Sequence, residues 1–318
     1  MPDQSDPAQP ARTINPPGYT VTIIGTQDSL KRLLEELAEW PLDRVLPYGM
    51  EGVDDGRTSH LIFVTFYFAT KSTVYLVDIM TLGKKAFQLY HRTSLKSILS
   101  SPKIRKITFD VKAACKTTFN TYRVAPYNVE GVQLLHAAAA TNNMRTLKWL
   151  KHCLECDSPF TPISVQRWQR NNHDLWVGDN SHSTNIYRFA LFTIRPTRED
   201  VQKVCANHLI VLPVLYTYYA SGLPPKTRNE VWNETQGIIT TLMSTGIGTP
   251  GPRNPWFRPE ERECPGGLTA APVVPVEHMV VGAPVFVRGQ PPPAPDMDHE
   301  QWEFIESVWE DDAVFVSR

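Results

Sequence analysis

The 318-residue chain carries 32 Lys and Arg against 33 Asp and Glu, and 42% of its residues are hydrophobic. This composition excludes a largely disordered protein, because enough apolar side chains are present to form a core. The chain has no run of about 18 apolar residues, and its first 17 residues have no apolar h-region, so we expect neither a membrane span nor a secretory signal.

The first 80 or so residues of the chain predict one helix and four strands. Residues 1–17 are rich in Pro and polar side chains and are expected to be disordered. The strand-like segment Tyr19–Gly25 follows, and Thr26 or Asp28 is placed to cap a helix. That helix carries Leu30, Leu33, Leu34 and Leu37 on one face. Short apolar runs then predict three strands, of which the last two are joined by a brief turn and should be antiparallel neighbours: Arg44–Met50, Leu61–Phe68 and Thr73–Ile79.

Beyond Gly83 the predicted helices and strands alternate. The expected helices are Lys84–His91, Ser94–Leu99, Val111–Tyr122 and Val132–Cys153, and the expected strands are Lys106–Phe109 and Val129–Val132. Residues 154–194 show no clean period and are interpreted as irregular. Arg198–Ser221 predicts a closing helix that Pro213 should kink. A strand meander followed by alternating helices and strands predicts an α/β domain with a mixed sheet flanked by helices.

Composition and charge divide the chain into three parts. We expect a disordered head at 1–17, one domain at about 18–240, and a Pro/Gly-rich linker with an acidic, aromatic tail at 241–318. Residues 18–228 carry 26 Lys and Arg against 17 Asp and Glu, whereas residues 229–318 carry 5 against 14. A basic body favours a polyanionic partner, and the tail is a candidate competitor for the same surface. Ordinary solvated surfaces are the alternative. Within the tail, Trp302, Ile305 and Trp309 have the spacing of one face of a short amphipathic helix.

Several sequence segments resemble the 3'–5' exonuclease domain of the DEDD superfamily, which has a ribonuclease H-like fold. The resemblance covers roughly residues 20–222 and depends on the order of the segments as much as on each one. The segments are Glu51-Gly52-Val53, Val74-Tyr75-Leu76-Val77-Asp78, Thr81-Leu82-Gly83, Leu95-Lys96-Ser97-Ile98-Leu99, Lys106 with Phe109-Asp110-Val111, Val132-Gln133-Leu134-Leu135, and Arg195-Pro196 before a long helix.

The resemblance implies a specific chemistry. Two divalent ions promote phosphodiester hydrolysis, one activating the attacking water and the other stabilising the leaving oxygen. The family binds these ions with four carboxylates: an Asp-x-Glu pair on the first strand of the motif, an Asp in the helix after the fourth strand, and an Asp in the last helix. A Tyr or His four residues before the last Asp orients the water.

Most of those carboxylates have no counterpart in this chain. In our alignment the Asp-x-Glu pair falls on Gly49 and Glu51, so Glu51 is the one retained acid. The second Asp falls on Lys116 and the third on His208. Val204 stands at the Tyr position, and Gly131 replaces a further Asp that is usual before the Val-Gln-Leu-Leu segment. A Lys ammonium repels a divalent cation, so the resemblance implies a degenerate catalytic site without a metal, in which Gly49, Glu51, Lys116 and His208 converge.

Two other groups of residues have metal-binding alternatives. Asp110 is either the N-cap of the helix that begins at Val111, which we favour, or a substitute ligand beside Glu51 and His208. Cys153 and Cys156 have the spacing of zinc ligands, but no second pair follows, so reduced thiols are the simpler interpretation. The five cysteines are odd in number, which favours a reducing, intracellular compartment, cytoplasmic or nuclear.

The basic residues lie on segments that border the active-site cleft in the related fold. Phosphate contacts from such residues give binding that is independent of sequence and sensitive to salt, and Trp168 and Trp176 are candidates for base stacking. A solvated or protein-binding surface is the alternative for the cations, and core packing is the alternative for the tryptophans. The candidate nucleic-acid-binding residues are Lys84, Lys85, Lys103, Arg105, Lys106, Lys112, Lys116, Arg145, Lys148 and Lys151.

The sequence therefore predicts a pseudoenzyme: an exonuclease-like domain that binds nucleic acid, with single-stranded RNA favoured, or a partner protein through the aromatic-acidic tail. No cofactor is expected. The first alternative is an active 3'–5' exonuclease with a rebuilt site, which would need Mg²⁺ or Mn²⁺. The second is a protein-interaction scaffold.

Overall fold

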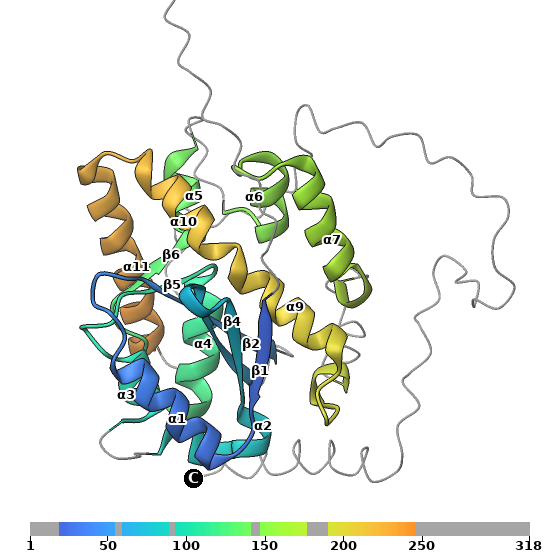
Figure 1. Ribbon diagram of the computed structural model, residues 1–318. Helices are drawn as coiled ribbons and strands as arrows, with labels where there is room; N and C mark the ends of the chain where they lie inside the picture. The colour runs from blue at the N-terminus through green and yellow to red at the C-terminus, as the bar shows by residue number, and fades with distance from the viewer. Residues whose placement is uncertain (1–18, 55–58, 89–92, 141–146, 177–189, 246–318) are drawn as a thin grey trace, which may run out of the picture.

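The computed structural model describes residues 19–54, 59–88, 93–140, 147–176 and 190–245. A six-stranded sheet in the order β1-β4-β3-β2-β5-β6 lies at its centre (Figure 1). Strands β2, β3 and β4 form the antiparallel meander, while β1 pairs with β4, β2 with β5, and β5 with β6 in parallel. The strands are β1 Thr20–Ile24, β2 Leu46–Asp54, β3 Ser59–Phe68, β4 Thr73–Asp78, β5 Lys106–Thr108 and β6 Val129–Gly131. The predicted mixed α/β sheet is confirmed.

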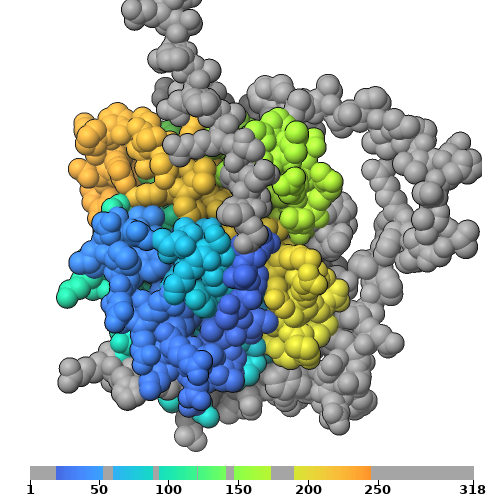
Figure 2. All heavy atoms as spheres, viewed as in Figure 1, coloured from blue at the N-terminus to red at the C-terminus, as the bar shows by residue number. Residues whose placement is uncertain are grey.

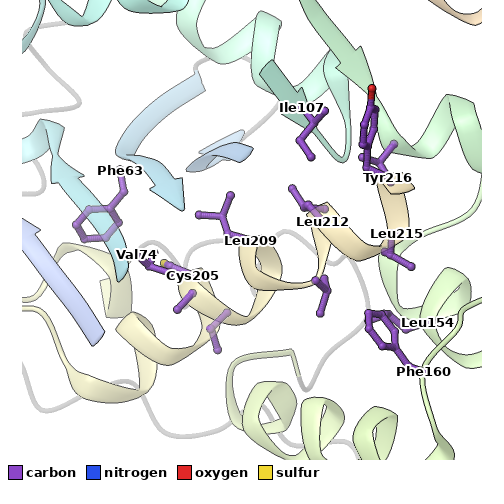
Figure 3. Packing of buried hydrophobic residues seen from close by; sticks show 14 of the residues in the cluster. Phe63, Val74, Ile107, Leu154, Phe160, Cys205, Leu209, Leu212, Leu215 and Tyr216 are labelled. Carbon is purple, nitrogen blue, oxygen red and sulfur yellow. The ribbon is translucent and has the colours of Figure 1, made fainter. Parts of the chain in front are cut away.

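Helices cover both faces of the sheet, because successive strand residues point to opposite sides. On β3, Phe63 packs into one core and Val64 into the other. One core includes residues of α1 (Gln27–Ala38), α3 (Leu95–Leu99) and α4 (Val111–Tyr122). The other, shown in Figure 3, includes residues of α5 (Val132–Ala139), α6 (Leu150–Cys156), α9 (Glu199–Ile210) and α10 (Leu212–Ser221). A last helix, α11 (Pro225–Thr245), packs against α4, α5 and β6.

Local sequence signals explain the helix starts. Thr26 and Ser29 form a capping box at the start of α1, and Ser94 forms one at the start of α3, which satisfies backbone N–H groups that a helix leaves unpaired. Asp110 caps α4: its Oδ1 accepts a hydrogen bond from the Ala113 N–H at 3.0 Å. The favoured interpretation of Asp110 as an N-cap is therefore confirmed.

Three predicted segments were wrong in the structure. In the described part of the expected helix Lys84–His91, residues 84–87 belong to a 3-10 turn, η2 (Gly83–Phe87), which follows the short helix α2 (Ile79–Leu82). A second short 3-10 turn, η1 (Ala69–Lys71), joins β3 to β4. Within the described residues, the expected helix Val132–Cys153 contains α5 and the first part of α6, which Ala140 and residues 147–149 do not join as helix. Residues 154–194, which we expected to be irregular, include a 15-residue helix, α7 (Pro162–Trp176). Its sequence shows no clean helical period, and its packing on α9 supplies stability that the local pattern does not reveal.

Pro213 does interrupt the closing helix, and more completely than a kink. α9 ends at Ile210 and α10 starts at Leu212, with Pro213 in its first turn, where the missing N–H has no helical partner to lose. The peptide bond between Arg195 and Pro196, just before α9, is cis. No helix in the described residues combines the length and apolar character that a membrane span requires.

Lys106 is fully buried in β5, and its Nζ donates hydrogen bonds to the Ser101 and Ile104 carbonyl oxygens at 3.0 and 2.7 Å. Burial lowers the pKa of this ammonium to about 7. Because the unfolded chain keeps its ordinary Lys pKa, it binds more protons than the folded chain between pH 7 and about 10.5. The free energy of unfolding should therefore rise with pH in that window, by at most about 1.4 kcal/mol per pH unit from this group.

Replacing Lys106 with Met should remove this rise. Urea unfolding at pH 7.5, 8.5 and 9.5 measures it, with Lys103→Met, an exposed lysine in the preceding loop, as the matched control that keeps the wild-type slope. Parallel pH profiles for Lys106→Met and wild type would show that Lys106 keeps its ordinary pKa in the folded state.

Candidate functional site

The retained acid, Glu51, is positioned by a bulge in β2. The pairing of β2 with β3 shifts register between Glu51 and Gly52, and such a bulge turns the neighbouring side chain. A Cβ at Gly52 would lie 2.2 Å from the backbone oxygen of His60. The close approach of the two strands at the bulge therefore requires glycine at this position.

Helix α9 brings His208 to Glu51. α9 packs across β2, β3 and β4, and the His208 Nδ1 lies 3.4 Å from the Glu51 Oε1. The two side chains are 18% and 14% exposed, so this pair borders solvent without being freely hydrated. The predicted meeting of Glu51 and His208 is observed, although 157 residues separate them in the sequence.

Gly49, at the position of the leading Asp, has its side-chain space filled by neighbours. A Cβ there would lie 2.7 Å from the Thr65 Oγ1 and 3.6 Å from a Leu209 methyl group. Thr65 is directly opposite Gly49 in the β2–β3 register and is fully buried. A carboxylate at position 49 therefore cannot be accommodated unless Thr65 moves.

Two further degenerate positions, Val204 and Gly131, are also enclosed by packed neighbours. Val204, at the Tyr position, is a core residue of α9. A Cβ at Gly131 would lie 2.8 Å from the Val111 Cγ2, so α4 occupies the space next to that position. Both substitutions are thus built into the packing of the domain.

Lys116 lies on α4 and is half-buried. The buried residues of that helix, among them Val111, Ala114 and Cys115, contact the opposite core from the one that α9 packs into. The convergence of Lys116 with Glu51 and His208 stays a prediction.

Trp168 of α7 completes the surroundings of the Glu51–His208 pair. Its Nε1 donates to the Asn207 carbonyl oxygen at 3.0 Å, and its ring centre lies 6.3 Å from that of His208. Trp168 is half-buried and packs on the core, so the packing interpretation accounts for its position. The Trp176 side chain lies outside the described residues. Sequence reasoning did not identify Thr65, Leu209 or Asn207 as neighbours of the site, because strand register and helix packing place them there.

The candidate nucleic-acid-binding residues have different environments. Lys106 must be removed from the set, because its ammonium is buried and bonded to backbone carbonyls. Arg105 is half-exposed and bonded to Glu130 and Tyr216. Arg145 lies outside the described residues, and so do Trp302, Ile305 and Trp309 of the tail. The remaining surface candidates are exposed or half-exposed: Lys84, Lys85, Lys103, Lys112, Lys148 and Lys151.

The cysteines within the described residues give no support for a zinc site. Cys115, Cys153 and Cys205 are free and buried, and burial raises the pKa of the Cys153 thiol to about 12. The Cys156 Sγ lies 3.8 Å from the His152 Nδ1. Within the described ranges, no three His, Cys, Asp or Glu side chains are grouped as metal ligands. One carboxylate and one imidazole at the Glu51–His208 pair do not fit a two-ion centre, which needs a set of bridging carboxylates.

The comparisons with known proteins agree on the fold. No protein-family model and no curated protein matches the chain. RNase D of Trypanosoma brucei in complex with GMP is 17% identical over 74% of this chain and 68% of that chain, with a TM-score of 0.58. RNase D of the same organism in complex with RNA U12 is 17% identical over 75% of this chain and 78% of that chain, with a TM-score of 0.55. The chain therefore has the fold of the RNase D exonuclease domain, as the sequence resemblance implied.

Proposed function

We propose that this protein is a catalytically degenerate exonuclease-like domain that binds single-stranded nucleic acid, with RNA favoured, and does not cut it. The observation that carries the proposal is the occupied space at Gly49. The Thr65 Oγ1 lies where a side chain at the position of the leading carboxylate would begin, Leu209 contacts the same space, and the single acid left, Glu51, lies beside His208.

Binding is supported by charge and by the relatives. Residues 18–228 carry 26 Lys and Arg against 17 Asp and Glu, which favours a polyanion. The RNase D of Trypanosoma brucei is described in complex with RNA U12, and this favours RNA as the partner of the shared fold. A protein partner for the aromatic-acidic tail stays an alternative.

The test combines cleavage and binding. Incubated with Mg²⁺ or Mn²⁺, the protein should leave a 5'-labelled single-stranded RNA at full length, because one carboxylate does not hold two ions. Fluorescence anisotropy should show binding of the same RNA, with an affinity that falls as salt rises. Glu51→Ala should leave both results unchanged.

Two outcomes would contradict the proposal. Metal-dependent shortening from the 3' end that Glu51→Ala abolishes would establish the active alternative. The absence of RNA and DNA binding even at low salt would favour the scaffold alternative.

A further inference from the structure

A second cluster of charged residues lies away from the Glu51–His208 pair. Tyr216 of α10 is its centre: its hydroxyl accepts a hydrogen bond from the Arg105 Nη2 at 2.9 Å and from the Arg228 Nη2 at 2.6 Å, and donates to the Glu130 Oε1 at 3.1 Å. Arg105 also donates to the same Glu130 oxygen at 3.0 Å. The four residues come from four segments, the loop before β5, β6, α10 and α11, so the folded domain alone assembles them.

The cluster holds more positive charge than its internal pairing requires. Two guanidinium groups surround one carboxylate, and the second Glu130 oxygen lies 3.8 Å from the Arg228 Nη2. The Glu130 side chain is 11% exposed, whereas those of Arg105 and Arg228 are 40% and 39% exposed. The negative charge therefore faces inward and the two positive charges face solvent.

Both arginines keep donors for a ligand. Each guanidinium has five N–H groups, and within the described part of the chain the partners of both side chains are reached through Nη2. These contacts thus leave the Nε and Nη1 donors of each guanidinium for a ligand, on side chains that are 40% and 39% exposed. The exposed Lys103 lies two residues before Arg105 and adds positive charge nearby, whereas Lys226, two residues before Arg228 on α11, lies on the other side of that helix. Glu230 lies two residues after Arg228, on the other side of α11 from it.

We infer that Arg105 and Arg228 form a preorganised site for a phosphate group, and specifically for the backbone of a single strand. Arginine forks match phosphate oxygens in geometry, and the Tyr216 hydroxyl fixes two side chains that would otherwise lose rotamer freedom on binding. The identification of the phosphate as part of a nucleic-acid strand depends on the proposed function; the phosphate site itself does not.

The site is separate from the degenerate catalytic position. Arg105 precedes β5, whose first residue, Lys106, is level with Leu46 of β2. Glu51 lies five residues further along β2, which places the two sites roughly 15 Å apart along the strand direction. Figure 3 shows Tyr216 beside Ile107 of β5, and α11 forms part of the outer surface in Figure 2 (orange). A strand that crosses both sites would run along the side of the domain where α9 and α10 lie.

The first arm of the test uses inorganic phosphate. At constant ionic strength, replacing chloride with phosphate should raise the Tm of wild type and of Arg32→Gln, an exposed Arg on α1, by the same amount. The increment should be smaller in Arg228→Gln and in Tyr216→Phe, which keeps both charges and removes only the hydroxyl that holds them. For each variant, the Tm in phosphate is compared with the Tm of the same variant in chloride, so a general loss of stability does not imitate the effect.

The second arm uses the single-stranded RNA of the binding assay. Arg105→Gln and Arg228→Gln should each weaken RNA binding about five- to tenfold and reduce the slope of log K against log salt by about 0.7, the value for one phosphate contact on a single strand. Arg32→Gln should change neither.

The outcomes separate this inference from the proposed function. Equal phosphate increments in all variants would overturn the phosphate site even if RNA binds. Smaller increments in Arg228→Gln and Tyr216→Phe, with RNA binding equal to that of Arg32→Gln, would keep the phosphate site but overturn its assignment to a strand. An absence of RNA binding by wild type would overturn the proposed function and the strand assignment together, while the first arm still decides the phosphate site.

Discussion

Replacing Asp78 with Asn is expected to lower the free energy of unfolding by about 3–5 kcal/mol, because it leaves the Arg195 guanidinium without its buried counter-ion. Arg195 donates through Nε and Nη2 to the two Asp78 carboxylate oxygens at 2.6 and 2.7 Å. It also donates to the Phe192 and Ile194 carbonyl oxygens and lies over the Phe63 ring. The Asp78 side chain is only 3% exposed, so water does not replace the lost partner.

This ion pair also positions the site. Asp78 ends β4, and Arg195 stands four residues before α9, the helix that carries His208. Loss of the pair should therefore loosen α9 against the sheet. Urea unfolding measures the stability change, and Asp200→Asn is the matched control: the side chains of its pair with Arg198 are 47% (Arg198) and 34% (Asp200) exposed, so the pair should contribute less than about 1 kcal/mol.

A double variant tests the cause. Asp78→Asn combined with Arg195→Met removes both charges and should cost less than the sum of the two single changes, because no charge remains buried and unpaired. Additive losses, or an Asp78→Asn variant as stable as Asp200→Asn, would contradict a role for the pair.

The second large effect is expected at Gly52. Gly52→Ala should destabilise the fold by about 3 kcal/mol, because the new Cβ would meet the backbone oxygen of His60 at 2.2 Å and only a shift of the paired strands relieves that contact. Since the bulge at Gly52 sets the direction of the Glu51 side chain, the same change should separate Glu51 from His208.

Alanine substitutions at two other glycines provide stability changes for comparison with Gly52→Ala. Gly49→Ala should cost less than Gly52→Ala, because its obstacle is the Thr65 hydroxyl, a side-chain atom that can rotate away. Gly237→Ala lies within α11 with no atom near its new Cβ and should stabilise the helix by about 0.5–1 kcal/mol. Thermal unfolding of the three variants should follow this order, and a neutral Gly52→Ala would show that the bulge tolerates a side chain.

At the candidate site, the packing around Gly49 matches the replacement of a metal-binding Asp by glycine. Position 49 is not an open gap that waits for a carboxylate: Thr65 and Leu209 have taken its space. Restoring Asp at position 49 alone would therefore test packing before it tests catalysis. Either rotation of the Thr65 side chain or Thr65→Ala would have to accompany it to make room.

The sequence by itself determined the strands, most helices and the family likeness, because these depend on local signals. The short apolar runs of β2, β3 and β4, the caps at Thr26, Ser94 and Asp110, and the Arg195-Pro196 pair before α9 are all readable within a few residues. The meeting of Glu51 with His208 was also predicted, through the register of short motifs and not through periodicity.

Only the tertiary structure decided which side chains are available. Lys106 reads as one more surface cation in the sequence, but β5 lies inside the sheet and buries it. The sequence of α7 has no clear helical period, and the packing of this helix on α9 supplies part of its stability. The Tyr216 cluster joins residues 12 to 111 positions apart, and the Thr65 contact depends on the exact pairing of two strands. Such long-range pairings are set by packing of the whole domain, and no local sequence pattern encodes them.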